Sequence, residues 1–126
     1  MRYAMMICVD EKAAAAETTA ETASDASMSE VYAWFEKWAG AGKVADGGAE
    51  LESVSTARTI RGAGNERTVT DGPFIETKES VGGFVILEAD TFDEALEVAS
   101  TWPGLAYDSV SVEVRPTVDH SGDMPS

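Results

Sequence analysis

The sequence predicts an α+β fold in which an antiparallel sheet carries two helices on one face. Three observations predict it: short apolar or β-branched segments, two amphipathic stretches with helical spacing, and the alternation of these segments along 126 residues. A chain of this length is expected to form one domain. We place that domain at residues 1–117 and a polar tail at residues 118–126.

The first part of the chain is expected to contain a strand, a loop and a helix. Residues 3–9 are apolar almost throughout, which predicts a strand covered on both faces. Residues 11–27 are rich in Ala, Thr and Glu and lack large apolar side chains, which favours a mobile loop, with a frayed helical turn as the alternative because Ala also favours helix. Ser27 and Glu30 have the spacing of a helix capping box. The apolar stripe that follows at helical spacing consists of Val31, Trp34, Phe35 and Trp38. This stripe is interpreted as core, or alternatively as the lining of a ligand pocket or subunit contact.

The second part of the chain is expected to complete the sheet. The elements expected in order are a loop at 43–50, a hairpin over 54–70, a strand at 84–87, a helix at 92–102 and a strand at 110–115. Thr91 and Glu94 form a second capping box, and Pro103 is expected to end that helix. The resulting order of elements predicts a ferredoxin-like sandwich with an extra β-hairpin.

Composition excludes several classes of function. Nine basic residues against 23 acidic ones give a net charge of −14, which disfavours direct binding to nucleic acid or to anionic lipid. This charge is interpreted as a solubilising surface, or alternatively as a docking surface for a basic protein. No apolar run approaches the roughly 20 residues that cross a bilayer, and the N-terminus does not resemble a signal peptide. A single cysteine fits a reducing compartment, so we expect a cytoplasmic protein.

Few residues could carry nucleophilic or metal chemistry. His120, the only histidine, lies in the polar tail, and Cys8 lies within a predicted buried strand. A zinc site or a Ser-His-Asp or Cys-His pair therefore cannot be assembled, and no metal or cofactor is expected. Cys8 is interpreted as a small core residue, with a reactive thiol as the alternative.

The densest polar segment is residues 70–84, which precede a core strand. Asp71, Glu76, Lys78 and Glu79 lie within nine positions of one another there. The sequence Asp71-Gly72-Pro73 strongly favours a turn, so Asp71 is interpreted as a residue that caps this turn. The alternative is that its carboxylate points into a cleft and acts as an acid–base group. The other charged residues form a solvated loop with local ion pairs, or contribute to ligand binding.

The chain resembles the DGPF branch of the YCII-related proteins. The segments that carry the resemblance are RYAMMI, VTDGPFIETKESVGGF, FDEALEVA and SVSVEVRP. The resemblance implies a ferredoxin-like fold that dimerises through its sheets into an α/β barrel. Relatives in that superfamily hold small organic molecules between sheet and helices, often without a cofactor. The DGPF branch also occurs fused to sigma-factor domains, which implies a role linked to transcription.

The resemblance also implies which residues form a site. Asp71 matches the Asp of the motif and is the candidate catalytic residue. In the YCII-related family an Asp and a His imply enzymatic activity, and that His would lie near the first helix. The helix around Trp34 contains no histidine, so the helper of Asp71 would be Arg58, Arg61, Tyr3, Tyr32 or water. The candidate ligand-binding residues are Tyr3, Arg58, Arg61, Gly72, Pro73, Phe74, Glu76 and Lys78.

Two functions are therefore weighed. The first is a cofactor-free homodimer that binds a small organic molecule in a cleft beside Asp71, with or without transforming it. The second is a non-enzymatic interaction module with a protein partner in transcription regulation. A homodimer is expected in addition because an apolar sheet face opposite the helices must be covered.

Overall fold

A four-stranded antiparallel sheet forms the centre of the computed structural model, which describes residues 1–17, 21–73 and 78–122 and no side chain between 17 and 27. From edge to edge the strands are β2 (Val44–Glu50), β5 (Ser80–Glu88), β1 (Arg2–Val9) and β6 (Val110–Pro116). All three neighbouring pairs are antiparallel. The predicted α+β fold with an antiparallel sheet is confirmed.

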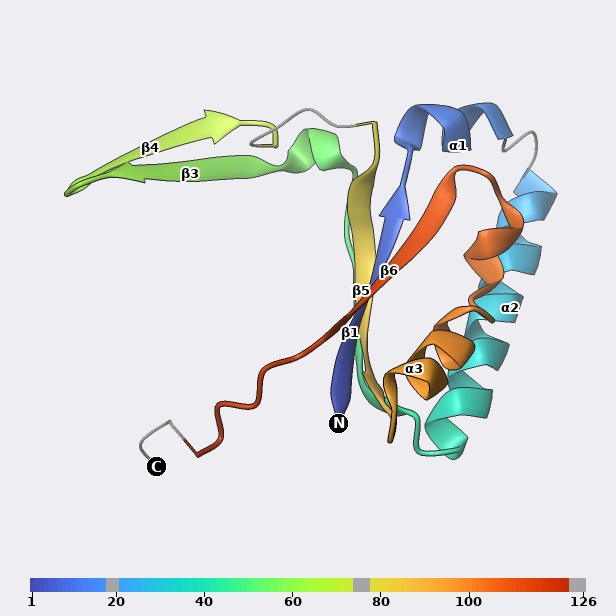
Figure 1. Cartoon of the computed structure of the whole chain (residues 1–126). Coiled ribbons are helices and arrows are strands. Elements are labelled where there is room, and N and C mark those ends of the chain that lie inside the picture. Colours follow the sequence, from blue (N-terminus) through green and yellow to red (C-terminus); the bar gives the residue numbers. More distant parts are fainter. Residues whose placement is uncertain (18–20, 74–77, 123–126) are drawn as a thin grey trace.

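Two helices cover one face of this sheet (Figure 1). They are α2 (Glu21–Gly40) and α3 (Phe92–Ala99), while the short helix α1 (Glu11–Glu17) lies at one end of the sheet. The described residues also contain two 3₁₀ turns, η1 (Val54–Thr56) and η2 (Pro103–Ala106). The core lies between sheet and helices, where the fully buried side chains include Met5, Val85, Leu87 and Val98.

The aromatic stripe of α2 belongs partly to this core. Trp34 is buried and packs edge-on against Trp102, with ring centroids 5.0 Å apart. The indole N–H groups of Trp34 and Trp38 both donate to Oγ1 of Thr101, each at 2.9 Å. Because these bonds satisfy the polar tips of two large rings, α2 is anchored to the end of α3.

Residues 11–17 and 21–27 are helical, so the loop predicted over 11–27 is wrong, apart from residues 18–20, which lie outside the described residues. Asp10 starts α1: its carboxylate accepts the N–H of Ala13 at 3.1 Å and its carbonyl accepts that of Ala14 at 2.8 Å. The helix α2 begins at Glu21, before the predicted cap Ser27. The Ala-rich composition thus favoured helix, since Ala has the highest helix propensity.

Residues 44–50 form β2, so the loop predicted at 43–50 is wrong as well. Pairing with β5 is irregular, with register shifts on either side of Asp46. The segment is poor in residues that favour strands, but its backbone pairs with β5 at the edge of the sheet. This tertiary pairing outweighs the local preference of the residues. The cap Thr91 is confirmed, with Glu94 N–H donating to its Oγ1 at 3.2 Å. However, α3 ends at Ala99 rather than reaching Pro103.

The predicted hairpin is confirmed as a projecting arm over residues 58–71, but residues 54–56, which were expected in its first strand, form the turn η1 instead. The arm, as we call it, consists of β3 (Arg58–Ala63) and β4 (Glu66–Asp71), which pair only with each other. Gly64, at φ +62°, opens its two-residue turn, as glycine does in tight hairpins. In Figure 1 the arm leaves one end of the sheet on the side opposite α2 and α3.

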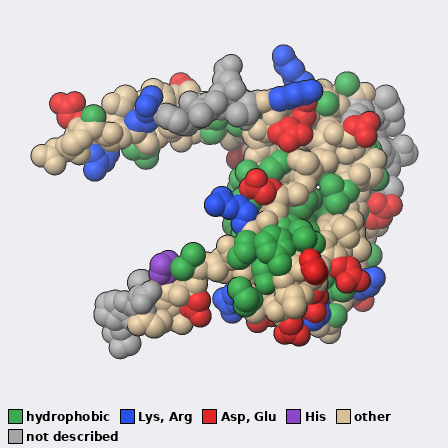
Figure 2. Space-filling view, viewed as in Figure 1, with side chains coloured by type: hydrophobic (Ala, Val, Ile, Leu, Met, Phe, Trp, Pro, Cys, Tyr) green, Lys and Arg blue, Asp and Glu red, His purple; other side chains and the backbone are tan. Residues whose placement is uncertain are grey.

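The sheet face opposite the helices is apolar at its centre and uncovered. This open face, as we call it, carries Ala4, Met6, Phe84 and Ile86, which the register places opposite one another on β1 and β5. Phe84 is 38% exposed, and Figure 2 shows a hydrophobic patch on the body of the molecule between the arm and the C-terminal segment. Residues 3–9 are therefore covered by helices on one face only within a single chain.

Candidate functional site

A cavity lies where the arm joins the sheet. This arm-base cavity has a volume of about 1010 Å³. Four segments surround it: the start of α1, the η1 turn, the end of the arm and the start of β5. Its lining residues are Asp10, Glu11, Lys12, Ala13, Ser53, Val54, Ser55, Gly72, Pro73, Lys78 and Ser80.

Both carboxylates of this cavity already accept hydrogen bonds from the protein. Glu11 accepts hydrogen bonds from Ser53 Oγ at 2.6 Å and from the N–H of Val54 at 2.8 Å. These two bonds, the Ser53 bond first, hold the pKa of Glu11 below its ordinary value of 4.5. Asp10, a buried residue, caps α1 as described above. Both carboxylates therefore act as structural acceptors that fix the wall.

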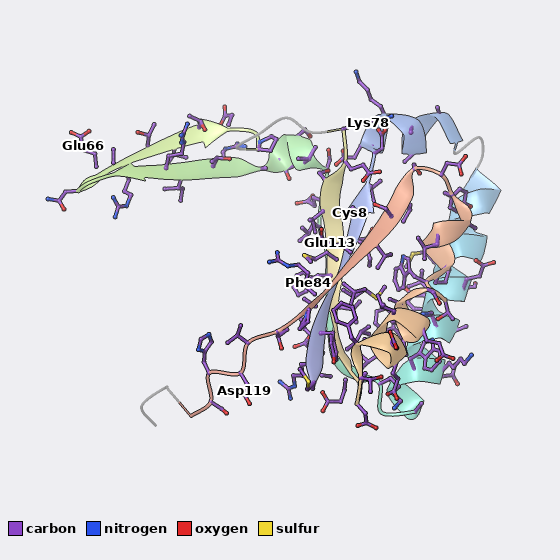
Figure 3. The ribbon with its side chains drawn as sticks, viewed as in Figure 1. Cys8, Glu66, Lys78, Phe84, Glu113 and Asp119 are labelled. Atoms are coloured by element: carbon purple, nitrogen blue, oxygen red, sulfur yellow. The ribbon has the colours of Figure 1, made fainter. Side chains whose placement is uncertain are left out.

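The cations of the cavity are not paired in this way. Lys12 and Lys78 have no carboxylate within ion-pair distance among the described residues. In contrast, Lys43 pairs with Glu94, and Lys37 lies over the ring of Trp38 at 4.6 Å. Figure 3 labels Lys78 at the base of the arm. The cavity thus offers two ammonium groups and the hydroxyl of Ser80 to a ligand.

Asp71 lies at the end of β4, directly before this cavity. Its Oδ1 is 3.0 Å from Nε of Arg58, the residue opposite it across the arm. The Asp71 side chain is 90% exposed. Its neighbour Gly72 is one of the described residues that line the cavity, whereas Asp71 is not. Gly72 has φ +90°, and its N–H donates to Ala57 at 2.7 Å, so a left-handed glycine turns the chain off the arm.

The structure brings some of the predicted site residues together and separates others. Gly72, Pro73 and Lys78 line the arm-base cavity, and Arg58 lies next to it through Asp71. Arg61 lies further out on the arm. Tyr3 is buried in the core against Phe92, at the end of β1 far from the arm. Phe74 and Glu76 lie outside the described residues.

A second cavity of about 470 Å³ lies between α2 and the sheet. This α2 cavity is mainly apolar. Its lining residues are Ile7, Val9, Met28, Val31, Tyr32, Phe35, Gly47, Gly48, Ala49, Glu50, Gly82, Gly83, Phe84, Val85 and Trp102. Of the aromatic stripe, Val31 and Phe35 line this cavity, and Trp34 belongs to the core.

Sequence reasoning missed Lys12 and Ser53 as cavity residues. Residues 11–27 were expected to form a loop, so no wall was expected from them. The signal available was Asp10 directly before an Ala-rich run, which is a helix start. Within the described ranges, no group of three His, Cys, Asp or Glu side chains is placed to hold a metal ion. No helix there is long and apolar enough to span a membrane.

The fold and the cavity define a small α+β protein with a projecting arm and a ligand-sized hollow at the base of that arm. The chain belongs to the YCII-related domain family, which it matches over residues 1–118. It is also 34% identical over 127 aligned positions to an uncharacterized protein of Rhizobium meliloti (strain 1021), with all of both chains covered. The activity of this family member is not established by either comparison.

Proposed function

We propose that this chain is a cytoplasmic, cofactor-free homodimer of the DGPF branch that binds a small organic anion in the arm-base cavity. The observation that carries the proposal is the pair of lysines, Lys12 and Lys78, that line this cavity without a carboxylate partner among the described residues. An ammonium group gives strong, charge-assisted hydrogen bonds to a carboxylate. Ser80 adds a hydroxyl to the same lining, whereas the hydroxyl of Ser53 already donates to Glu11.

The net charge of −14 does not prevent anion binding at this place. At physiological salt the Debye length is about 8 Å, so distant surface carboxylates are screened while lysines in contact are not. The two nearest carboxylates, Glu11 and Asp10, are held by hydrogen bonds to protein N–H and O–H groups. With Lys12 and Lys78 against these two carboxylates, the lining is balanced in charge, so the strongly negative charge of the whole chain does not extend into the cavity.

Asp71 is the proposed acid–base group for any turnover of that ligand. Support comes from its position next to Gly72, which lines the cavity, and from Arg58 within 3.0 Å. Its exposure keeps the carboxylate solvated, so a ligand must cover it before it can act as an effective base.

Titration with benzoate, with neutral benzyl alcohol as the matched probe, tests the binding site. We expect benzoate to shift amide resonances of residues 10–13, 53–55 and 78–80, and Lys12→Gln or Lys78→Gln to weaken binding at least tenfold, the loss of a charge-assisted bond being worth about 1.5–3 kcal/mol. Lys37→Gln, which changes a lysine far from the cavity, should leave binding unchanged. Shifts confined to the α2 cavity, or equal binding of both probes, would contradict the proposal.

The proposed homodimer would close two ferredoxin-like sandwiches into an α/β barrel through their sheets. Support comes from the apolar centre of the open face, where Met6, Phe84 and Ile86 lie together on β1 and β5. A sheet face of this kind is stable when another layer covers it. Sedimentation at 1–100 µM is expected to give a dimer.

A second candidate function, a non-enzymatic interaction module with a protein partner in transcription regulation, is favoured by the arm. Every residue of β4 is exposed, which is typical of a segment available to a partner. Failure of all anionic probes, with specific capture of a purified sigma factor, would favour this candidate over ligand binding. Nucleic acid is not a proposed partner because of the acidic net charge.

A further inference from the structure

The arm exposes apolar side chains that no other part of the described chain covers. Its two strands pair only with each other, and an isolated two-stranded hairpin is marginally stable in water. Ile60 and Val69 face each other across the arm and are 67% and 61% exposed. Two β-branched side chains, placed as a cross-strand pair and left in water, indicate a contact that one chain alone does not make.

The charge of the arm differs in sign from that of the rest of the chain. Residues 58–71 contain three arginines, Arg58, Arg61 and Arg67, against Glu66 and Asp71, a net charge of +1. Since the whole chain has −14, the remainder has −15. A basic arm on an acidic body is attracted to an acidic surface, and a second copy of this chain presents one.

The arm also projects in the direction from which a second copy would approach. It lies on the side of the open face, opposite α2 and α3 (Figure 1). The open face carries Glu113 and Arg115 beside its apolar centre, because the register places them opposite Met6 and Ala4. Figure 3 labels Glu66 near the tip of the arm, well away from the body of its own chain. The Ile60–Val69 pair therefore does not cover its own sheet.

We propose that the arm of each chain lies against a second copy of the chain, with Ile60 and Val69 buried in that contact. This inference rests on the proposed homodimer and adds the segment that clasps it. In a two-fold dimer the contact is made twice, once by each arm. The same contact would order the base of the arm, where Gly72 and Pro73 line the arm-base cavity.

Removing the apolar pair tests this clasp. Ile60→Thr with Val69→Thr keeps β-branched side chains and hence strand propensity, while it removes the apolar contact. We expect the dimer dissociation constant, measured by sedimentation, to rise at least tenfold. The matched control is Leu96→Gln on α3, which removes a 45% exposed apolar side chain on the helical side and should leave the constant unchanged.

Hydrogen exchange at two protein concentrations gives an independent readout. Amides of residues 60–69 should be protected above the dissociation constant and exchange rapidly after dilution below it, whereas β1 and β5 amides should remain protected in both. A wild-type dimer whose arm exchanges equally fast at both concentrations, or whose constant is unaffected by the double variant, overturns the clasp and leaves the sheet-to-sheet dimer. A wild-type monomer at 100 µM overturns both.

Discussion

Cys8 illustrates how the surroundings of one side chain set its chemistry. Burial raises the pKa of its thiol, and the carboxylates of Glu113 and Glu79 raise it further by repelling the thiolate. Figure 3 shows Cys8 and Glu113 labelled on the sheet. Since the thiolate is the reactive form, Cys8 should behave as the packing residue that the sequence predicts rather than as a reactive thiol.

We expect Cys8 to react with Ellman's reagent at pH 8 at least tenfold more slowly than the cysteine of the urea-unfolded chain, because a raised pKa and partial burial both reduce the accessible thiolate. Glu113→Gln should speed the reaction, since it removes one of the two repelling charges. Glu97→Gln, on the exposed side of α3, serves as the control. Equal rates in the folded and unfolded chain would contradict this account.

Asp71→Asn separates the structural role of this residue from its proposed chemical role. The ion pair with Arg58 is exposed, at 59% for Arg58 and 90% for Asp71, so we expect the free energy of unfolding to fall by less than about 1 kcal/mol. Any turnover should fall about 100-fold if the carboxylate is a general base. Arg58→Gln removes the same ion pair but keeps the carboxylate. A turnover loss of equal size in both variants would indicate a structural role.

At the scale of single elements, the pairing of β2 with β5 requires a glycine at position 48. Gly48 has φ +67°, and a Cβ built there would lie 1.8 Å from the carbonyl oxygen of Phe84. Gly48→Ala should therefore destabilise the chain by more than the roughly 1–2 kcal/mol that a left-handed Ala costs. Gly42→Ala, at φ +74° with open space around it, should cost only that conformational term. Equal urea midpoints for the two variants would show that β2 shifts freely.

The contact between Lys43 and Glu94 joins the start of β2 to the first turn of α3. This hydrogen-bonded pair raises the pKa of Lys43 and lowers that of Glu94 below its ordinary value of 4.5. A lowered carboxyl pKa stabilises the fold above that ordinary value, and the stabilisation is lost as the pH falls through the folded-state pKa.

Glu94→Gln should therefore lower the urea midpoint at pH 7, and its difference from the wild type should shrink as the pH falls below 4.5. Glu97→Gln on the same helix controls for the loss of one negative charge. A difference that stays constant from pH 7 to pH 3 would exclude the ion pair as its cause.

At the scale of the whole molecule, charge opposes folding. With 23 acidic residues and nine basic ones, repulsive pairs outnumber attractive ones, and the compact state concentrates them. We expect the thermal midpoint to rise by several degrees between 10 and 200 mM NaCl, because salt screens this repulsion more than it weakens the ion pairs seen among the described residues. Differential scanning calorimetry at fixed protein concentration measures it. A midpoint that falls with salt would show that the ion pairs dominate.

Local chemistry explains the elements that sequence reasoning predicted well. The hairpin follows from its β-branched strands and the glycine at its turn, and the start of α3 follows from the Thr91 hydroxyl. Two of the segments that were predicted wrongly are those in which different structural preferences compete. Residues 11–17 contain no large apolar side chain, yet their alanines form α1 once Asp10 caps it. Residues 44–50 are poor in β-formers, yet β5 pairs with them.

The sequence by itself determined the α+β class, the alternation of elements, the arm and the acidic surface, because these depend on residue type and on spacing along the chain. Only the tertiary structure decided that Lys12, Ser53 and Lys78 share one cavity, that Asp71 meets Arg58, and that Tyr3 lies in the core. These facts join residues from separate segments. Such contacts arise from packing and strand register, which bring distant residues together and which no local pattern in the sequence records.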